Sequence, residues 1–188
     1  THHIIHMVEV APTKIILLQV FSDGASRGNP GKSGAGTVIM YENVEIASAY
    51  RYIGAYSTNN EAEYEGLLLG IETVMHLIDS QKPESASIPI KIEFMMDSKL
   101  VVEQMSGRWK INKPHLQVLK NRALAALQNT SSTFSFHHVA RTHNTVADMA
   151  ANKAVDTKSH HRVVLPGFFQ NREQFFRKQP TNRVIFMK

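Results

Sequence analysis

Four acidic residues occupy positions where a carboxylate contributes little to packing but could bind a ligand or take part in catalysis. Each lies at the expected end of a strand or in the first turn of an expected helix, on an inward-facing position; they are Asp23, Glu63, Asp97 and Asp148. Carboxylates that gather without basic partners repel one another, and a bound divalent cation removes that repulsion. Since hard oxygen ligands favour Mg²⁺ or Mn²⁺, the four acids predict a metal centre.

Asp23 and Asp97 each follow an apolar run that predicts a buried strand. Ile15 to Phe21 leads to Asp23, and Ile90 to Met96 carries its apolar residues on one side before Asp97. If the two strands are parallel neighbours joined by a crossover helix, their ends place the two aspartates side by side. Asp-Gly by itself is a common turn dipeptide, so the prediction depends on the other acids.

Glu63 and Asp148 lie on the inward faces of two expected helices. The first helix runs from about residue 59 to 80, with Glu63 on the same stripe as Leu67. The second runs to about residue 157, with Asp148 on the same stripe as Ala151. A carboxylate on a buried face is costly unless it is paired, hydrogen-bonded or bound to metal. The alternative, an acid that compensates the helix dipole, fits Asp148 and explains Glu61 better than Glu63.

The order of the expected elements predicts a mixed α/β sheet. Strands over residues 14–22, 34–41 and 46–56 form an antiparallel meander, and further strands follow at 90–96 and 133–139 with helices between them. The expected fold is therefore α/β, with a five-stranded mixed sheet, three antiparallel strands and then two parallel ones, flanked by helices.

Charge divides the 188-residue chain into an acidic part and a basic tail. The formal net charge is +5, and residues 158–188 contain Glu173 as their one acid against Lys158, Arg162, Arg172, Arg177, Lys178, Arg183 and Lys188. Between Glu103 and Asp148 there is no acid, while the bases there are Arg108, Lys110, Lys113, Lys120, Arg122 and Arg141. This division favours a metal site beside a polyanion-binding surface; the alternative is a chance partition of solvated charges.

The composition excludes several classes of protein. Cysteine is absent, which excludes a disulfide scaffold and thiolate metal sites and suits a reducing compartment. No apolar run approaches the length of a membrane-spanning helix, so we expect no membrane partner. The chain begins at Thr1, so we expect it to be processed, trimmed or cut from a longer product, with a removed targeting peptide as one possibility. Residues 1–13 are expected to be a lead-in, in which His2, His3 and His6 could bind metal but more often mark a frayed end.

Four short segments, in a fixed order and spacing, carry a family resemblance. They are Asp23-Gly24-Ala25-Ser26 with Gly28-Asn29-Pro30-Gly31, Thr58-Asn59-Asn60-Glu61-Ala62-Glu63, Asp97-Ser98, and Asn144 four residues before Asp148. Through these segments, residues 14–157 resemble type 1 ribonuclease H in the compact form found in archaeal and plant-type proteins. The resemblance implies a ribonuclease H-like domain over 14–157, with 158–188 as a basic, Phe-rich extension outside it.

The resemblance also implies a reaction, the endonucleolytic hydrolysis of the RNA strand of an RNA–DNA hybrid with two Mg²⁺ ions, for which Mn²⁺ could substitute. In that scheme Asp23 binds both ions, Glu63 and Asp97 complete one site, and Asp148 supports the other. The family often has a histidine in the loop before the last aspartate, and Arg141 or His143 could fill its role in turnover.

A surface for the nucleic acid is implied as well. Residues that match family positions near the substrate backbone are Gly24, Asn29, Thr58, Asn59 and Asn60. Amides and backbone groups there could read the 2′-hydroxyls that distinguish RNA from DNA. Arg108, Trp109 and Lys110 could contact the DNA strand, although the tryptophan could equally serve packing.

The extension supports a competing hypothesis. Of nine phenylalanines it contains Phe168, Phe169, Phe175, Phe176 and Phe186, so it is too apolar for a typical linker and too short to fold alone. It could return to the domain, bind structured RNA, or dock into a larger assembly. In the last case the chain would be a structural subunit of a ribonucleoprotein such as an organellar ribosome; a fragment of a retrotransposon polyprotein is a third possibility. We expect an intracellular protein, with the mitochondrion favoured over the nucleus or cytoplasm, and retention of all four acids favours the nuclease.

Overall fold

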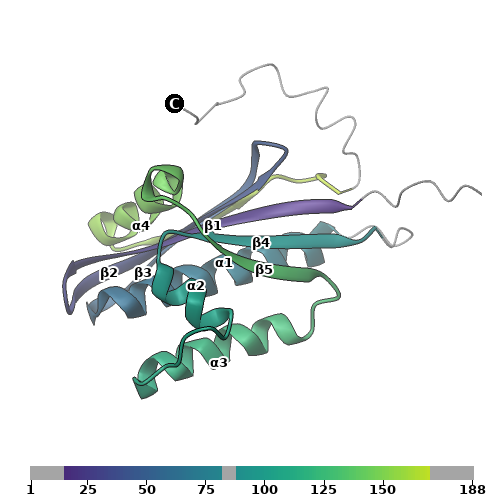
Figure 1. Cartoon of the computed structure of the whole chain (residues 1–188). Coiled ribbons are helices and arrows are strands. Elements are labelled where there is room, and N and C mark those ends of the chain that lie inside the picture. Colours follow the sequence, from purple (N-terminus) through teal and green to yellow (C-terminus); the bar gives the residue numbers. More distant parts are fainter. Residues whose placement is uncertain (1–14, 82–87, 170–188) are drawn as a thin grey trace, which may run out of the picture.

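A computed structural model describes residues 15–81 and 88–169 (Figure 1). Its strands are β1 (Ile16–Gly28), β2 (Gly31–Tyr41), β3 (Val44–Ser57), β4 (Ile90–Met96), β5 (Thr133–His138) and β6 (His160–Val164). Its helices are α1 (Asn59–Gln81), α2 (Lys99–Met105), α3 (Pro114–Gln128), the 3₁₀ helix η1 (Arg141–His143) and α4 (Thr145–Thr157). The strands form one mixed sheet in the order β5-β4-β1-β2-β3-β6, which confirms the expected α/β class.

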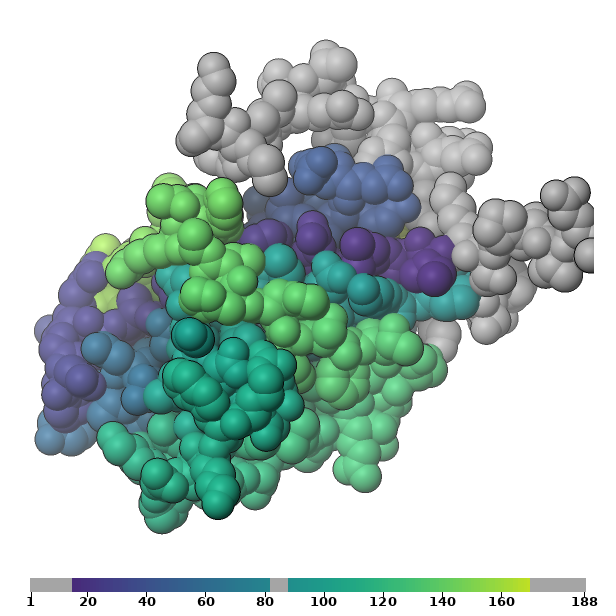
Figure 2. All heavy atoms as spheres, in the orientation of Figure 1, coloured from purple at the N-terminus to yellow at the C-terminus, as the bar shows by residue number. Residues whose placement is uncertain are grey.

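Helices cover both faces of this sheet. Figure 1 shows α4 on one face and α1 on the other, with α3 beyond α1. In the same orientation, Figure 2 shows the teal and green residues of α2 and α3 on the lower part of the near face and the light-green residues of α4 on its upper part. The main apolar core includes Leu18 and Phe94 of the sheet and Leu67 of α1, all completely buried. None of the helices in the described ranges combines the length and apolar character needed to cross a bilayer.

The pairing of β1 decides where Asp23 lies. β1 pairs with β2 in antiparallel fashion from Gln19 to Gly28, and with β4 in parallel fashion from Ile16 to Ser22. The predicted adjacency of these two parallel strands is confirmed. The prediction that the first strand ends at Ser22, directly before Asp23, is wrong, because pairing with β2 carries β1 on to Gly28. Asp23 instead lies where β1 loses β4 as its neighbour.

β6 is a strand that the sequence does not predict. The sequence predicts that the sheet has five strands and that residues 158–188 lie outside the domain. In the structure, β6 pairs with β3 in antiparallel fashion, from Ala47 opposite Val164 to Arg51 opposite His160. Most of its residues are exposed, so it lacks the apolar alternation that marks a half-buried strand. Over residues 15–81 and 88–169, the sheet therefore has six strands.

The chain after β6 also joins the core. Phe168 is completely buried, and its ring centroid lies 4.9 Å from that of Tyr41. The buried Gln81 at the end of α1 donates from Nε2 to the carbonyl of Leu165 at 2.7 Å and accepts at Oε1 from the N–H of Phe168 at 2.8 Å. The expected boundary after Thr157 therefore does not mark the end of the packed chain. The tail's other predicted residues Phe175, Phe176 and Phe186, and the lead-in 1–13 with His2, His3 and His6, lie outside the described residues.

We predict that Phe168→Ala lowers the free energy of unfolding by about 3 kcal/mol, because it removes a fully buried ring from the core. Urea unfolding followed by circular dichroism measures this change. Val163→Ala is the control, since Val163 is 42% exposed on β6 and should cost less than about 0.5 kcal/mol. A Phe168→Ala variant as stable as the wild type would contradict the inclusion of this segment in the domain.

Candidate active site

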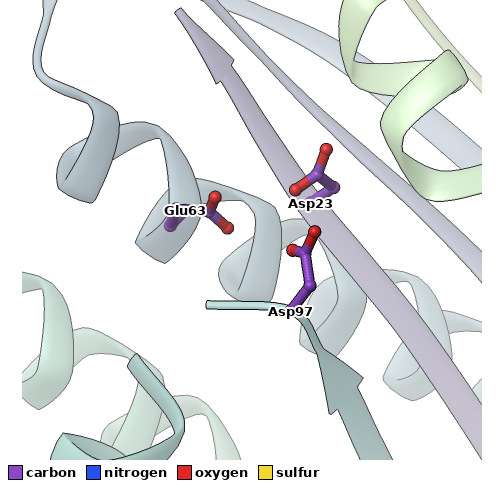
Figure 3. A group of neighbouring side chains, drawn as sticks. All are labelled: Asp23, Glu63 and Asp97. Carbon is purple, nitrogen blue, oxygen red and sulfur yellow. The ribbon is translucent and has the colours of Figure 1, made fainter. Parts of the chain in front are cut away.

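Three of the four predicted acids meet in one cluster. Asp23 of β1, Glu63 of α1 and Asp97, directly after β4, each place a carboxylate oxygen within 4.8 Å of the others. Figure 3 shows the three side chains converging from these elements. The parallel pairing of β1 with β4 brings the two aspartates together, as the sequence predicts.

Close packing of α1 on β1 brings Glu63 to this cluster. A β-carbon at Gly24 would lie 2.1 Å from the backbone carbon of Ala62, and one at Gly66 would lie 2.4 Å from the carbonyl oxygen of Asp23. These distances are too short for any side chain, so a larger residue at either position would push the helix away from the strand. The two glycines therefore allow the distance between helix and strand that the carboxylate cluster requires.

A reciprocal pair of hydrogen bonds determines where α1 begins. Thr58 Oγ1 accepts from the N–H of Glu61 at 3.3 Å, and Glu61 Oε2 accepts from the N–H of Thr58 at 2.7 Å, which is a capping box. Asn29 Oδ1 accepts from the N–H of Asn59 at 3.1 Å and ties the β1–β2 turn to the helix start. Of the predicted substrate contacts here, Asn29 and Thr58 thus have structural partners, Asn59 is exposed, and Asn60 is half-buried in the first turn.

Burial and mutual repulsion favour the protonated forms of two of the acids. Desolvation, followed by the charges of Asp97 and Asp148, raises the pKa of Asp23 to about 8. Desolvation, followed by the charges of Asp23 and Asp97, raises the pKa of Glu63 well above its ordinary value. Glu63 Oε2 is buried and has no hydrogen-bond partner among the described residues. A hard divalent cation fits this set of oxygens, because it would neutralise the repulsion and supply the missing partner.

Asp148 lies beside the three-carboxylate cluster, in the same pocket. This pocket of about 300 Å³ is lined by Asp23, Gly24, Ala25, Ser26, Arg27, Asn59, Glu63, Asp97, Arg141, Asp148 and Asn152. Asp148 Oδ1 accepts a hydrogen bond from Arg141 at 3.2 Å. All four predicted acids therefore share one pocket, and two arginines share it with them.

Other predicted site residues lie away from the acids. His143 is exposed on η1 and is not among the described residues that line the pocket. Arg108, Trp109 and Lys110 are exposed in the segment between α2 and α3, and they do not line it either. Arg108 forms an ion pair with Glu103 of α2. Their predicted roles in turnover and DNA contact stay predictions.

Arg27 and Asn152 also line the pocket, although no motif in the sequence indicates a role for them. Arg27 forms an ion pair with Asp156 of α4 at 3.1 Å, and the two residues are 129 positions apart in the chain. No local pattern marks such a pair. Asn152 donates to the carbonyl oxygen of Asp148 at 2.9 Å. Asp148 and Asn152 are spaced by about one helical turn, and this spacing is the signal that could have placed Asn152 on the same face of α4 as Asp148.

Comparisons with known proteins agree with this arrangement. A family model described as reverse transcriptase-like matches residues 21–154. The chain is 33% identical over 147 residues to Ribonuclease HI of Halobacterium salinarum, a match that covers 78% of this chain and 68% of that protein. The chain belongs to the ribonuclease H family.

Some relatives in the ribonuclease H family are longer proteins. Bifunctional protein Rv2228c of Mycobacterium tuberculosis is 41% identical over 137 residues, which cover 72% of this chain and 34% of that protein. The chain thus spans about a third of the length of this relative. The solved N-terminal RNase H domain of Rv2228c matches with a TM-score of 0.65 and 38% identity, over 76% of this chain and 95% of that one. LC11-RNase H1 in complex with an RNA/DNA hybrid matches with a TM-score of 0.67 and 31% identity, over 75% of this chain and 98% of that chain.

We predict that Asp23→Asn stabilises the metal-free protein more at pH 8 than at pH 5. The folded-state pKa of Asp23, about 8, exceeds its ordinary value of 3.8, so between these values the folded state binds more protons and stability falls as the pH rises. Removing the charge should therefore raise the free energy of unfolding at pH 8 by about 1–2 kcal/mol.

Urea unfolding in the presence of EDTA at both pH values measures this gain. Asp79→Asn, at an exposed position near the far end of α1, is the control and should change stability little at either pH. A gain for Asp23→Asn that is equal at the two pH values would contradict the raised pKa.

Proposed function

We propose that this chain is a divalent-metal-dependent endoribonuclease that hydrolyses the RNA strand of RNA–DNA hybrids. The observation that carries the proposal is the cluster of Asp23, Glu63 and Asp97, in which a buried oxygen of Glu63 lacks a hydrogen-bond partner among the described residues. The related LC11-RNase H1 was solved with an RNA/DNA hybrid, which supports the same class of substrate here.

The proposed cofactor is Mg²⁺, with Mn²⁺ able to substitute. Asp23, Glu63 and Asp97 offer oxygen ligands, the kind that these cations prefer. Asp148 lies in the same pocket and is proposed to support a second ion. When bound, two such ions would supply an activated water and stabilise the leaving 3′-oxygen.

The protein's own groups are proposed to attract and orient the nucleic acid. Among the described residues that line the acidic pocket, Arg27 and Arg141 are the two basic ones, so they offer the positive charge that a phosphate backbone requires. The capping box and the bond from Asn59 to Asn29 hold the start of α1 rigidly beside them. Amides in this segment are therefore well placed to read 2′-hydroxyls.

We predict that the purified chain cleaves the RNA strand of a labelled hybrid with Mg²⁺ and that EDTA abolishes the cleavage. Asp23→Asn should lower kcat by more than about 100-fold, because it removes a central ligand of the cluster. Asp79→Asn, which is exposed near the far end of α1, is the control and should leave kcat unchanged. A folded wild type that is inactive with both Mg²⁺ and Mn²⁺ would overturn the proposal.

A second prediction concerns Arg27. Arg27→Ala should raise KM for the hybrid by about tenfold. It should also reduce the slope of log KM against the logarithm of the salt concentration by about 1, because one phosphate contact is lost. Arg122→Ala is the matched control, since Arg122 is 49% exposed against 50% for Arg27 and also forms an ion pair, with Glu65 outside the pocket. A salt dependence equal to that of the wild type would contradict a phosphate contact.

The competing hypothesis is a structural subunit of a ribonucleoprotein, docked through the basic extension. Since residues 160–169 pack on the domain, such docking would depend on residues 170–188. Co-purification of an inactive chain with a large ribonucleoprotein, lost when 170–188 are deleted, would favour that hypothesis. The mitochondrial location stays a prediction.

A further inference from the structure

Asn144 occupies the N-cap position of α4 without capping the helix. At this position an asparagine usually accepts, through Oδ1, a hydrogen bond from an N–H of the first turn. The side chain of Asn144 makes no such bond, although it is 1% exposed. A favoured capping residue whose side chain turns away from its helix indicates a different role.

The Asn144 amide nitrogen instead joins the two central strands. Nδ2 donates to the carbonyl oxygen of Ser22 at 2.9 Å and to Oδ1 of Asp97 at 3.3 Å. A carbonyl can only accept, so the nitrogen of the amide must be the atom that faces Ser22. Ser22 immediately precedes Asp23, and its pairing with Met96 is the last between β1 and β4. The bridge therefore lies directly beside the carboxylate cluster.

The Asn144 backbone extends the connection to the fourth acid. Its carbonyl accepts from the N–H of Asp148 at 3.1 Å, and its N–H donates to the carbonyl of Arg141 at 3.0 Å. One residue thus links the strands that carry Asp23 and Asp97 to the helical turn that carries Asp148.

This arrangement costs stability. Oδ1 of Asn144 is buried and has no hydrogen-bond partner among the described residues. An unpaired buried acceptor costs about 1–3 kcal/mol, and a missing helix cap adds to that cost. A stabilising role alone does not explain a residue whose buried acceptor is unpaired and whose side chain leaves the helix uncapped.

We propose that Asn144 is a positioning residue for the metal centre. By holding the carboxylate of Asp97 beside β1, its Nδ2 presets the separation between Asp97 and Asp23, so that a cation does not have to order Asp97 on binding. This inference rests on the proposed metal-dependent function, but it concerns the affinity of the folded chain for the metal alone.

Two substitutions separate positioning from helix capping. Asn144→Ala removes both the bridging amide nitrogen and any oxygen that could cap the helix. Asn144→Ser supplies a capping oxygen on a side chain that is too short to bridge Ser22 and Asp97. A calorimetric titration of Mn²⁺ into the full chain should show an affinity about 10–100-fold weaker for both variants than for the wild type. The melting temperature of the serine variant should stay near that of the wild type or rise above it.

Gln81→Ala is the matched control, because it also removes a buried side-chain amide that forms two hydrogen bonds, in this case to two backbone groups beside the last residue of α1. It should lower the melting temperature and leave Mn²⁺ affinity unchanged. Wild-type affinity in Asn144→Ser would overturn the proposal, as would equal losses of affinity in Asn144→Ala and Gln81→Ala. If Asn144→Ala does not fold, the serine variant alone decides. A wild type that binds Mn²⁺ but cleaves no hybrid would overturn the proposed nuclease function alone, whereas one that binds no Mn²⁺ would overturn both proposals.

Discussion

The contact between α1 and β1 is the constraint on which the candidate site depends. Gly24 lies against the backbone of Ala62, and Gly66 lies against that of Asp23, with no room for a β-carbon at either glycine. Glu63 is consequently held beside Asp23 in a place where its negative charge is unfavourable. The fold thus assembles its carboxylates at a cost in stability, as proteins commonly do where a site must be ready for a ligand.

The charges around the cluster follow from the position of α4 across the other face of the sheet. Asp148 and Asp156 lie about two turns apart on this helix and pair with Arg141 and Arg27. Both arginines line the pocket that holds the acids. The same helix therefore contributes an acid to the pocket and orients the positive charge that a polyanion would need, while Asn144 at its start ties it to β1 and to Asp97.

Features with a local signature could be predicted from the sequence, and features that depend on distant partners could not. Apolar periodicity indicated β4 and α1, including the inward position of Glu63, and the order of the elements, with a crossover helix between two parallel strands, indicated that β1 and β4 are neighbours. The exposed strand β6 has no apolar alternation, so it was not predicted. Phe168 packs against Tyr41 from far along the chain, and the sequence offered such a return of the tail to the domain only as one of three alternatives. The role of the Asn144 side chain could not be predicted either. An asparagine at a helix start gives the same sequence signature whether its side chain caps the helix or turns away from it.

A crystal of the full chain soaked in Mn²⁺, with data collected at the manganese absorption edge, tests most directly whether Asp23, Glu63 and Asp97 form a ready site for a divalent cation. We expect an anomalous peak bounded by oxygens of all three carboxylates, because their separation suits one ion and the buried Oε2 of Glu63 has no hydrogen-bond partner among the described residues. Saturating Mn²⁺ that gives no peak at this position, or a peak bound only by other residues, would contradict the metal centre and the nuclease function built on it.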